Sequence, residues 1–83
     1  MKDLVNYVIN NFDQKNQDLI LIEEMSELTK ELLKKRREKD NWDELIEEMS
    51  HVYISLEVVK TLYGISDKDI QKQVDLKKEK YYI

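Results

Sequence analysis

Apolar residues recur three or four positions apart along most of the chain, which is the spacing of one face of an α-helix. The first such segment predicts a short helix over residues 2–11. The segment 10–13 then reads as a break, because Asn and Asp favour caps and turns. Two longer amphipathic segments predict helices over about 16–37 and 42–63. A fourth segment with a thinner apolar face predicts a helix over about 67–80.

The residues between these segments are typical of helix ends. The basic run Lys34–Arg37 suits a helix C-terminus, where cations meet the negative end of the macrodipole. Asn41, with Glu44 three residues later, resembles a capping box at the start of the third helix. Gly64 stands where a helix C-cap favours glycine, and Ser66–Asp69 offers an N-cap for the fourth helix.

Composition supports an all-α fold of one domain over residues 1–83. The chain has no proline and one glycine, and its 41% of hydrophobic residues suffices for a core. A domain this short buries only about 60% of its unfolded surface, so we expect stabilisation by a partner chain. The core is therefore expected to be an antiparallel helical hairpin with short flanking helices, joined to a second copy.

Charge and cysteine content narrow the classes of function. The chain has no cysteine, which excludes disulfides and thiolate metal sites. Its net charge of -4 argues against binding to nucleic acid. No apolar run approaches the length of a membrane span, and the N-terminal segment does not resemble a signal peptide. We therefore expect a soluble, cytoplasmic protein with no membrane partner.

The six letters LIEEMS occur twice, at 21–26 and 45–50. The copies lie 24 residues apart, which is about 6.7 turns, so one continuous helix would not place both on the same face. In an antiparallel hairpin, however, Glu24 lies opposite His51, and Glu27 lies opposite Glu48. Each pair on one helix is spaced i, i+3 and shares a helix face.

Three carboxylates and an imidazole beside an apolar interface would be costly unless a cation neutralised them. The pattern therefore predicts a metal site formed by Glu24, Glu27, Glu48 and His51. Oxygen-rich ligands favour Mg²⁺ or Mn²⁺, whereas the imidazole favours Mn²⁺, Fe²⁺, Zn²⁺ or Ni²⁺ over Mg²⁺. The alternative is a solvated acidic face with no ligand.

At these residues the chain resembles the MazG-like, all-α nucleoside triphosphate pyrophosphohydrolases. Residues 23–28 read EExxEL, and residues 47–52 read EExxHV where that superfamily usually has EExxDV. The resemblance runs from about residue 17 to residue 80. It implies hydrolysis of a nucleoside triphosphate to the monophosphate and pyrophosphate, with a divalent cation held by the acidic residues. It also implies a homodimer or homotetramer in which paired hairpins form a four-helix bundle.

Carried over to this chain, the resemblance implies that Glu24, Glu27 and Glu48 are catalytic metal ligands, with His51 at the usual Asp position. Glu23 and Glu47 are neighbours that could assist. The lysines of the last helix, which could hold a triphosphate, are Lys72, Lys77, Lys78 and Lys80.

Two other functions stay open. Glu48-x-x-His51 is also the motif of di-metal carboxylate bundles, which combine two such motifs with two further Glu residues. A helical interaction or regulatory protein without catalysis would equally use amphipathic, highly charged helices. Trp42, next to the hairpin turn, is expected to be a packing anchor.

Overall fold

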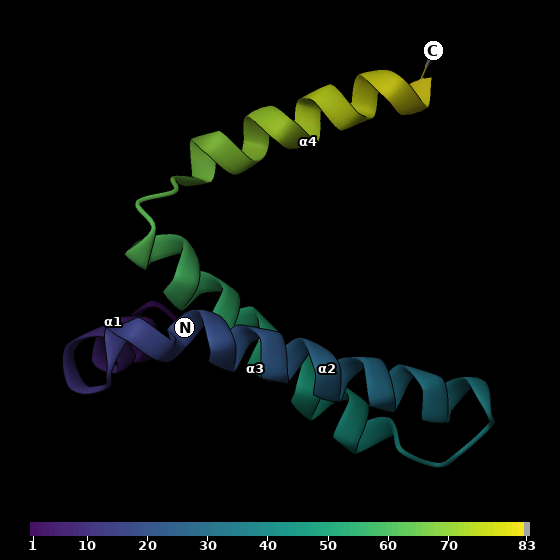
Figure 1. The fold of residues 1–83 in the computed structure, drawn as a ribbon. Coiled ribbons are helices and arrows are strands. Elements are labelled where there is room, and N and C mark those ends of the chain that lie inside the picture. Colours follow the sequence, from purple (N-terminus) through teal and green to yellow (C-terminus); the bar gives the residue numbers. More distant parts are fainter. Residues whose placement is uncertain (83) are drawn as a thin grey trace.

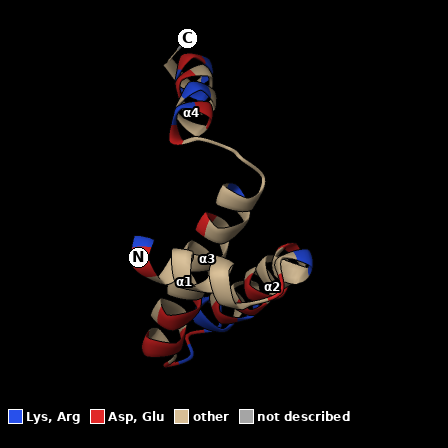
Figure 2. Cartoon of the chain, turned by 90° about the vertical axis from the view of Figure 1, so that its left-hand side faces the viewer, with Lys and Arg blue, Asp and Glu red and all other residues tan. Residues whose placement is uncertain are grey.

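The computed structural model describes residues 1–82 and contains helices but no strand among them (Figure 1). α2 and α3 form an antiparallel hairpin, and α1 packs against α3. α4 stands apart from these three helices in both views (Figures 1 and 2). The elements are α1 (Lys2–Asn11), the 3-10 turn η1 (Gln14–Asn16), α2 (Gln17–Arg36), α3 (Trp42–Leu62) and α4 (Asp67–Tyr82). The predicted all-α hairpin is thus confirmed, whereas its pairing with a second copy stays a prediction.

The glycine predicted to end the third helix does so. Gly64 has φ +70°, and its N–H donates to the carbonyl of Thr61 over 3.1 Å. The N–H of Ile65 donates to the carbonyl of Lys60 over 3.0 Å. These two bonds form a Schellman motif, which satisfies carbonyls that the end of α3 would otherwise leave unpaired.

α2 ends with the same motif but without a glycine. Glu38 has φ +62°, and its N–H donates to the carbonyl of Lys35 over 3.0 Å. The N–H of Lys39 donates to the carbonyl of Lys34 over 3.1 Å. A residue with a Cβ is strained in this left-handed conformation. The basic residues predicted for the end of α2 do lie in its last turn.

The capping box predicted for Asn41 and Glu44 is wrong. Asn41 occupies the N-cap position of α3, but its side chain makes no cap bond. It is buried, and its Nδ2 donates to Glu31 Oε2 over 2.6 Å and to the Glu31 carbonyl over 2.9 Å. This hydrogen bond, followed in importance by that from Lys34, lowers the pKa of the Glu31 carboxyl below its ordinary value. Asn41 therefore joins α3 to α2 instead of capping its own helix.

The apolar core is small. The buried hydrophobic side chains among the described residues are Val5, Leu45, Val58 and Val59. Val5 brings α1 onto α3, and the others belong to α3 itself. No helix within residues 1–82 has both the length and the apolar character needed to cross a bilayer.

Candidate metal centre

Polar residues occupy every seventh position along the facing sides of α2 and α3. Seven residues are about two turns, so such positions lie on one helix face. All six residues are buried or half-buried, and we call them the polar seam: Gln17, Glu24 and Glu31 on α2, with Asn41, Glu48 and Ser55 on α3. At the end near the hairpin turn, Asn41 and Glu31 are hydrogen-bonded. Glu24 and Glu48 lie two helical turns farther from the hairpin turn, and their side chains come together there.

Glu24 and Glu48 meet at His51. The Nδ1 atom of His51 lies 3.1 Å from Glu24 Oε2 and 3.5 Å from Glu48 Oε2. One ligand atom from each of the three residues lies within 4.8 Å of the others. The three side chains are partly buried, with 26% of Glu24, 20% of Glu48 and 39% of His51 exposed. We call them the Glu24–Glu48–His51 cluster.

The cluster contains two buried oxygen atoms without a hydrogen-bond partner, Glu24 Oε2 and Glu48 Oε2. An unpaired buried acceptor is costly, and an unpaired carboxylate oxygen more so. His51 Nδ1 lies close to both oxygens but forms a hydrogen bond to neither, and it carries at most one proton. A divalent cation would accept a lone pair from each. The donor set of two carboxylates and one imidazole fits such an ion, and the imidazole favours Mn²⁺ or Zn²⁺ over Mg²⁺.

Glu27, expected as the fourth ligand, does not join the cluster. Its side chain is 51% exposed and pairs with Lys30, whose Nζ lies 3.3 Å from Glu27 Oε1. The side of α2 that faces α3 runs through Glu24, Leu28 and Glu31, at spacings of four and three. Leu28 thus takes the inward position, and Glu27 falls beside it toward solvent. In consequence Glu48 faces Glu24 and not Glu27.

The two neighbouring glutamates lie outside the cluster. Glu47 is exposed, and its Oε1 lies 3.9 Å from His51 Nε2, on the other side of the ring from Glu24. This contact can help to set the orientation of the imidazole. Glu23 is exposed and does not belong to the group that could hold an ion.

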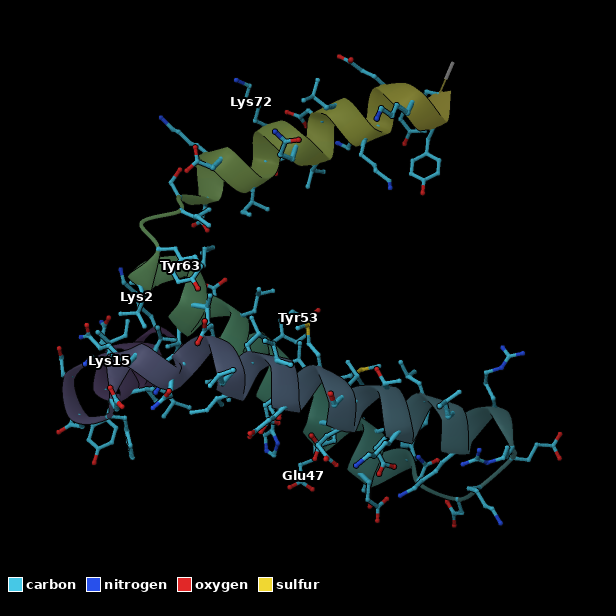
Figure 3. All side chains as sticks on the ribbon, in the orientation of Figure 1. Lys2, Lys15, Glu47, Tyr53, Tyr63 and Lys72 are labelled. Carbon is cyan, nitrogen blue, oxygen red and sulfur yellow. The ribbon has the colours of Figure 1, made fainter. Side chains whose placement is uncertain are left out.

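The lysines of α4 do not approach the cluster within one chain. Figure 3 shows Glu47, which neighbours His51, on the side of the hairpin away from α4, whereas Tyr53 points toward α4. Lys72 projects from α4 still farther away. α4 also carries acidic as well as basic residues along its length (Figure 2).

Trp42 is not the packing anchor that its position suggested. Its side chain is exposed, and Lys35 Nζ lies 5.5 Å from the ring centroid. This is a cation–π contact across the hairpin turn, of modest strength at an exposed site. The residue that closes the hairpin is Asn41, whose role was missed. The signal that could have revealed it is the seven-residue spacing from Glu24 to Glu31 and from Asn41 to Glu48.

Comparisons of the chain with protein-family models, curated proteins and solved structures gave no match. The resemblance to MazG-like enzymes therefore rests on the sequence motifs alone.

Proposed function

We propose that the protein is a metal-dependent nucleoside triphosphate pyrophosphohydrolase with its cation held by Glu24, Glu48 and His51. The observation that carries this proposal is the pair of buried carboxylate oxygens that lack a hydrogen-bond partner. They belong to the two copies of the repeated motif, and they converge on one imidazole. Elsewhere in the seam Asn41 Nδ2 satisfies Glu31 Oε2, while Asn41 Oδ1 lacks a partner of its own. The cluster differs in that both of its unpartnered atoms are carboxylate oxygens, which cost more to bury than an amide oxygen.

Each residue of the cluster has a definite task in this proposal. Glu24 and Glu48 supply oxygen ligands from facing helices, and His51 supplies Nδ1. Glu47, near His51 Nε2, helps to orient the imidazole, as outer partners of metal-binding histidines commonly do. A bound divalent cation would polarise a phosphoryl oxygen and lower the pKa of a coordinated water. Hydrolysis between the α- and β-phosphates would add water across the P–O bond and release monophosphate and pyrophosphate.

The donor set changes the expected metal preference. A four-carboxylate site suits Mg²⁺, but here an imidazole stands at the fourth position and Glu27 lies outside. We therefore expect Mn²⁺ to support activity better than Mg²⁺.

The substrate also requires positive charge, and α4 holds its lysines away from the cluster. A triphosphate is an anion, and phosphate contacts are commonly made by Lys or Arg. Because α4 holds its lysines on the other side of the hairpin, we propose that the enzyme works as a homodimer or homotetramer. The four-helix bundle of paired hairpins belongs to the same proposal.

A di-metal carboxylate bundle is the second candidate. It is favoured by the meeting of Glu24 with the Glu48-x-x-His51 motif, because two copies would supply two such motifs and two facing glutamates. Loading with Fe²⁺ in air distinguishes the two candidates. The bundle would develop near-ultraviolet absorption and consume oxygen, whereas the hydrolase would do neither.

The test is release of pyrophosphate from a panel of canonical and damaged nucleoside triphosphates with Mg²⁺ or Mn²⁺. We expect Glu24→Gln to abolish release and Glu27→Gln to retain most of it, because only Glu24 lies in the cluster. The same assay on His51→Asp should move the preference from Mn²⁺ toward Mg²⁺. Absence of release from the unaltered protein with every nucleotide and both metals would overturn the proposal and leave an interaction module.

A further inference from the structure

One face of α4 is apolar and largely exposed within residues 1–82. Ile70, Val74 and Tyr81 are exposed and recur at spacings of four and seven, so they share one face of the helix. Together with Gln73, Lys77 and Lys78 they line a shallow depression of about 430 Å³. We call Ile70, Val74 and Tyr81 the arm face.

The connection between α3 and α4 holds this helix away from its own hairpin. The Schellman motif at Gly64 ends α3. A reciprocal capping box begins α4: Asp69 N–H donates to Ser66 Oγ over 3.1 Å, and Ser66 N–H donates to Asp69 Oδ2 over 2.9 Å. Only Ile65 separates Gly64, in the Schellman motif that ends α3, from Ser66, in the capping box that begins α4. We call this connection the corner, and its short length restricts the backbone conformations that it can adopt.

An ion pair braces the same corner. Lys60, near the end of α3, pairs with Asp67 at the start of α4 and with Glu57 one turn earlier. Asp67 is the main cause of a raised pKa at Lys60, and Lys60 lowers the pKa of Asp67. These contacts and the two caps support the direction in which α4 leaves α3.

The hairpin presents a matching apolar face on the side toward α4. Tyr53 points to that side in Figure 3. The residues at helical spacing from it are also exposed, and we call this set the hairpin face: Ile46, Met49, Tyr53 and Leu56. At the corner the two faces meet in a hollow of about 370 Å³, whose apolar lining includes Leu56, Val59, Ile65 and Ile70.

The chain exposes more surface area than a compact monomer of the same mass would. It exposes 7013 Å², whereas a compact monomer of 10.1 kDa exposes about 5,300 Å². Its radius of gyration is 15.3 Å, against about 11.8 Å for a compact domain of this length. The excess of about 1,700 Å² per copy, doubled in a dimer, lies in the range of obligate homodimer interfaces.

We propose that α4 is an exchanged arm, whose arm face packs on the hairpin face of a second copy while the partner's α4 packs in return. Both complementary faces belong to one sequence, so a two-fold axis closes the contact and leaves neither face exposed. The excess area matches this occupant without any further partner. The hairpin face lies on the other side from Glu47, so the proposal does not depend on the metal site.

Two variants of α4 test whether the arm face forms the contact between copies, and the measured quantity is the mass of the protein in solution. Val74 and Leu76 are 43% and 45% exposed, but they lie on different sides of α4. We expect the unaltered protein to be a dimer, Val74→Asp to raise its dissociation constant at least about a hundredfold, and Leu76→Asp to change it little, because only position 74 is buried in the contact. Light scattering gives the masses, and circular dichroism checks that helicity is kept. A monomeric unaltered protein, or equal masses for the two variants, would overturn the proposal.

Cysteine cross-linking tests the exchange itself, since the chain has no cysteine of its own. Val74→Cys and Tyr53→Cys chains are mixed, and a short flexible bismaleimide is added. We expect a covalent heterodimer that each variant alone does not form to the same extent. In the double variant, a cross-link formed within one chain at high dilution would show that α4 folds back on its own hairpin, contrary to the proposal.

Discussion

Replacement of Glu48 by Gln is expected to remove the response of the protein to a divalent cation while keeping the fold. Glu48 and Gln have nearly the same shape, so the packing of the α2–α3 seam is retained. The substitution removes one of the two carboxylates that converge on His51. The metal-free variant should therefore be about as stable as the unaltered protein, because an amide in this place relieves repulsion between two acids.

The size of the response follows from the two unsatisfied oxygens. A buried acceptor without a partner costs about 1–3 kcal/mol, so satisfying Glu24 Oε2 and Glu48 Oε2 contributes about 2–6 kcal/mol. A stabilisation of about 2 kcal/mol is reached when the free metal concentration is about 30-fold above the dissociation constant of the metal. For 83 residues the entropy of unfolding is about 0.17 kcal/mol/K, so 2 kcal/mol raises the Tm by about 11 °C.

Thermal unfolding followed by circular dichroism, with and without Mn²⁺, measures this response. Protein concentration must be fixed, because association of copies would make the Tm depend on it. Glu27→Gln is the matched control: it is the same substitution in the same repeat, but its side chain pairs with Lys30 in solvent. We expect the full rise for the unaltered protein and for Glu27→Gln, and a rise of less than a third as much for Glu48→Gln.

Either of two results would refute this reasoning. An equal rise in Glu48→Gln would show that the ion binds elsewhere. A loss of the response in Glu27→Gln would restore the register predicted from the sequence, in which Glu27 faces Glu48.

Three further predictions concern the helix ends. Glu38→Gly should raise the unfolding free energy by about 0.5–1 kcal/mol in urea titration, because glycine relieves the strain at φ +62°. Ser66→Ala should cost about 1 kcal/mol, seen as faster amide exchange in α4, because a cap is lost. The Asp67–Lys60 pair stabilises the connection between α3 and α4 at pH values above the unfolded pKa of Asp67, near 3.8. This stabilisation is lost as the pH falls through the lower pKa that Asp67 has in the folded protein. Asp67→Asn should therefore reduce the fall in Tm that the unaltered protein shows on acidification, measured by thermal unfolding at a series of pH values.

Much of the fold could be predicted because its signals are local. Helical periodicity located all four helices to within two residues of their observed ends. Gly64 and Ser66 marked the corner between α3 and α4, since a left-handed C′ residue and an N-cap hydroxyl depend on their neighbours alone. Glu38 is an exception to these local signals. It occupies the left-handed position that ends α2, where glycine is favoured, so the sequence alone does not mark this helix end.

The register of the hairpin was harder to predict because it depends on packing between helices. Symmetry of the two motifs placed Glu24 opposite His51, and these two side chains do meet at 3.1 Å. The same symmetry placed Glu27 opposite Glu48. The structure instead places Glu24 there, because Leu28 takes the next inward position on α2. The contact between Asn41 and Glu31 fixes this register near the hairpin turn. The sequence analysis missed this contact because it assigned Asn41 to a capping box.

The polar seam and the exposed apolar faces have a common physical cause. Positions that would normally hold leucine or isoleucine between two helices are occupied by Glu24, Glu31, Asn41 and Glu48, so the hairpin buries little apolar surface of its own. Burying these groups stabilises the chain only where a partner satisfies them, as Asn41 does for Glu31. The remaining stabilisation must come from apolar residues outside the seam, and those lie exposed on α3 and α4. If the cluster binds a metal and α4 is exchanged with a second copy, as we propose, each of these events should raise the stability of the same folded state.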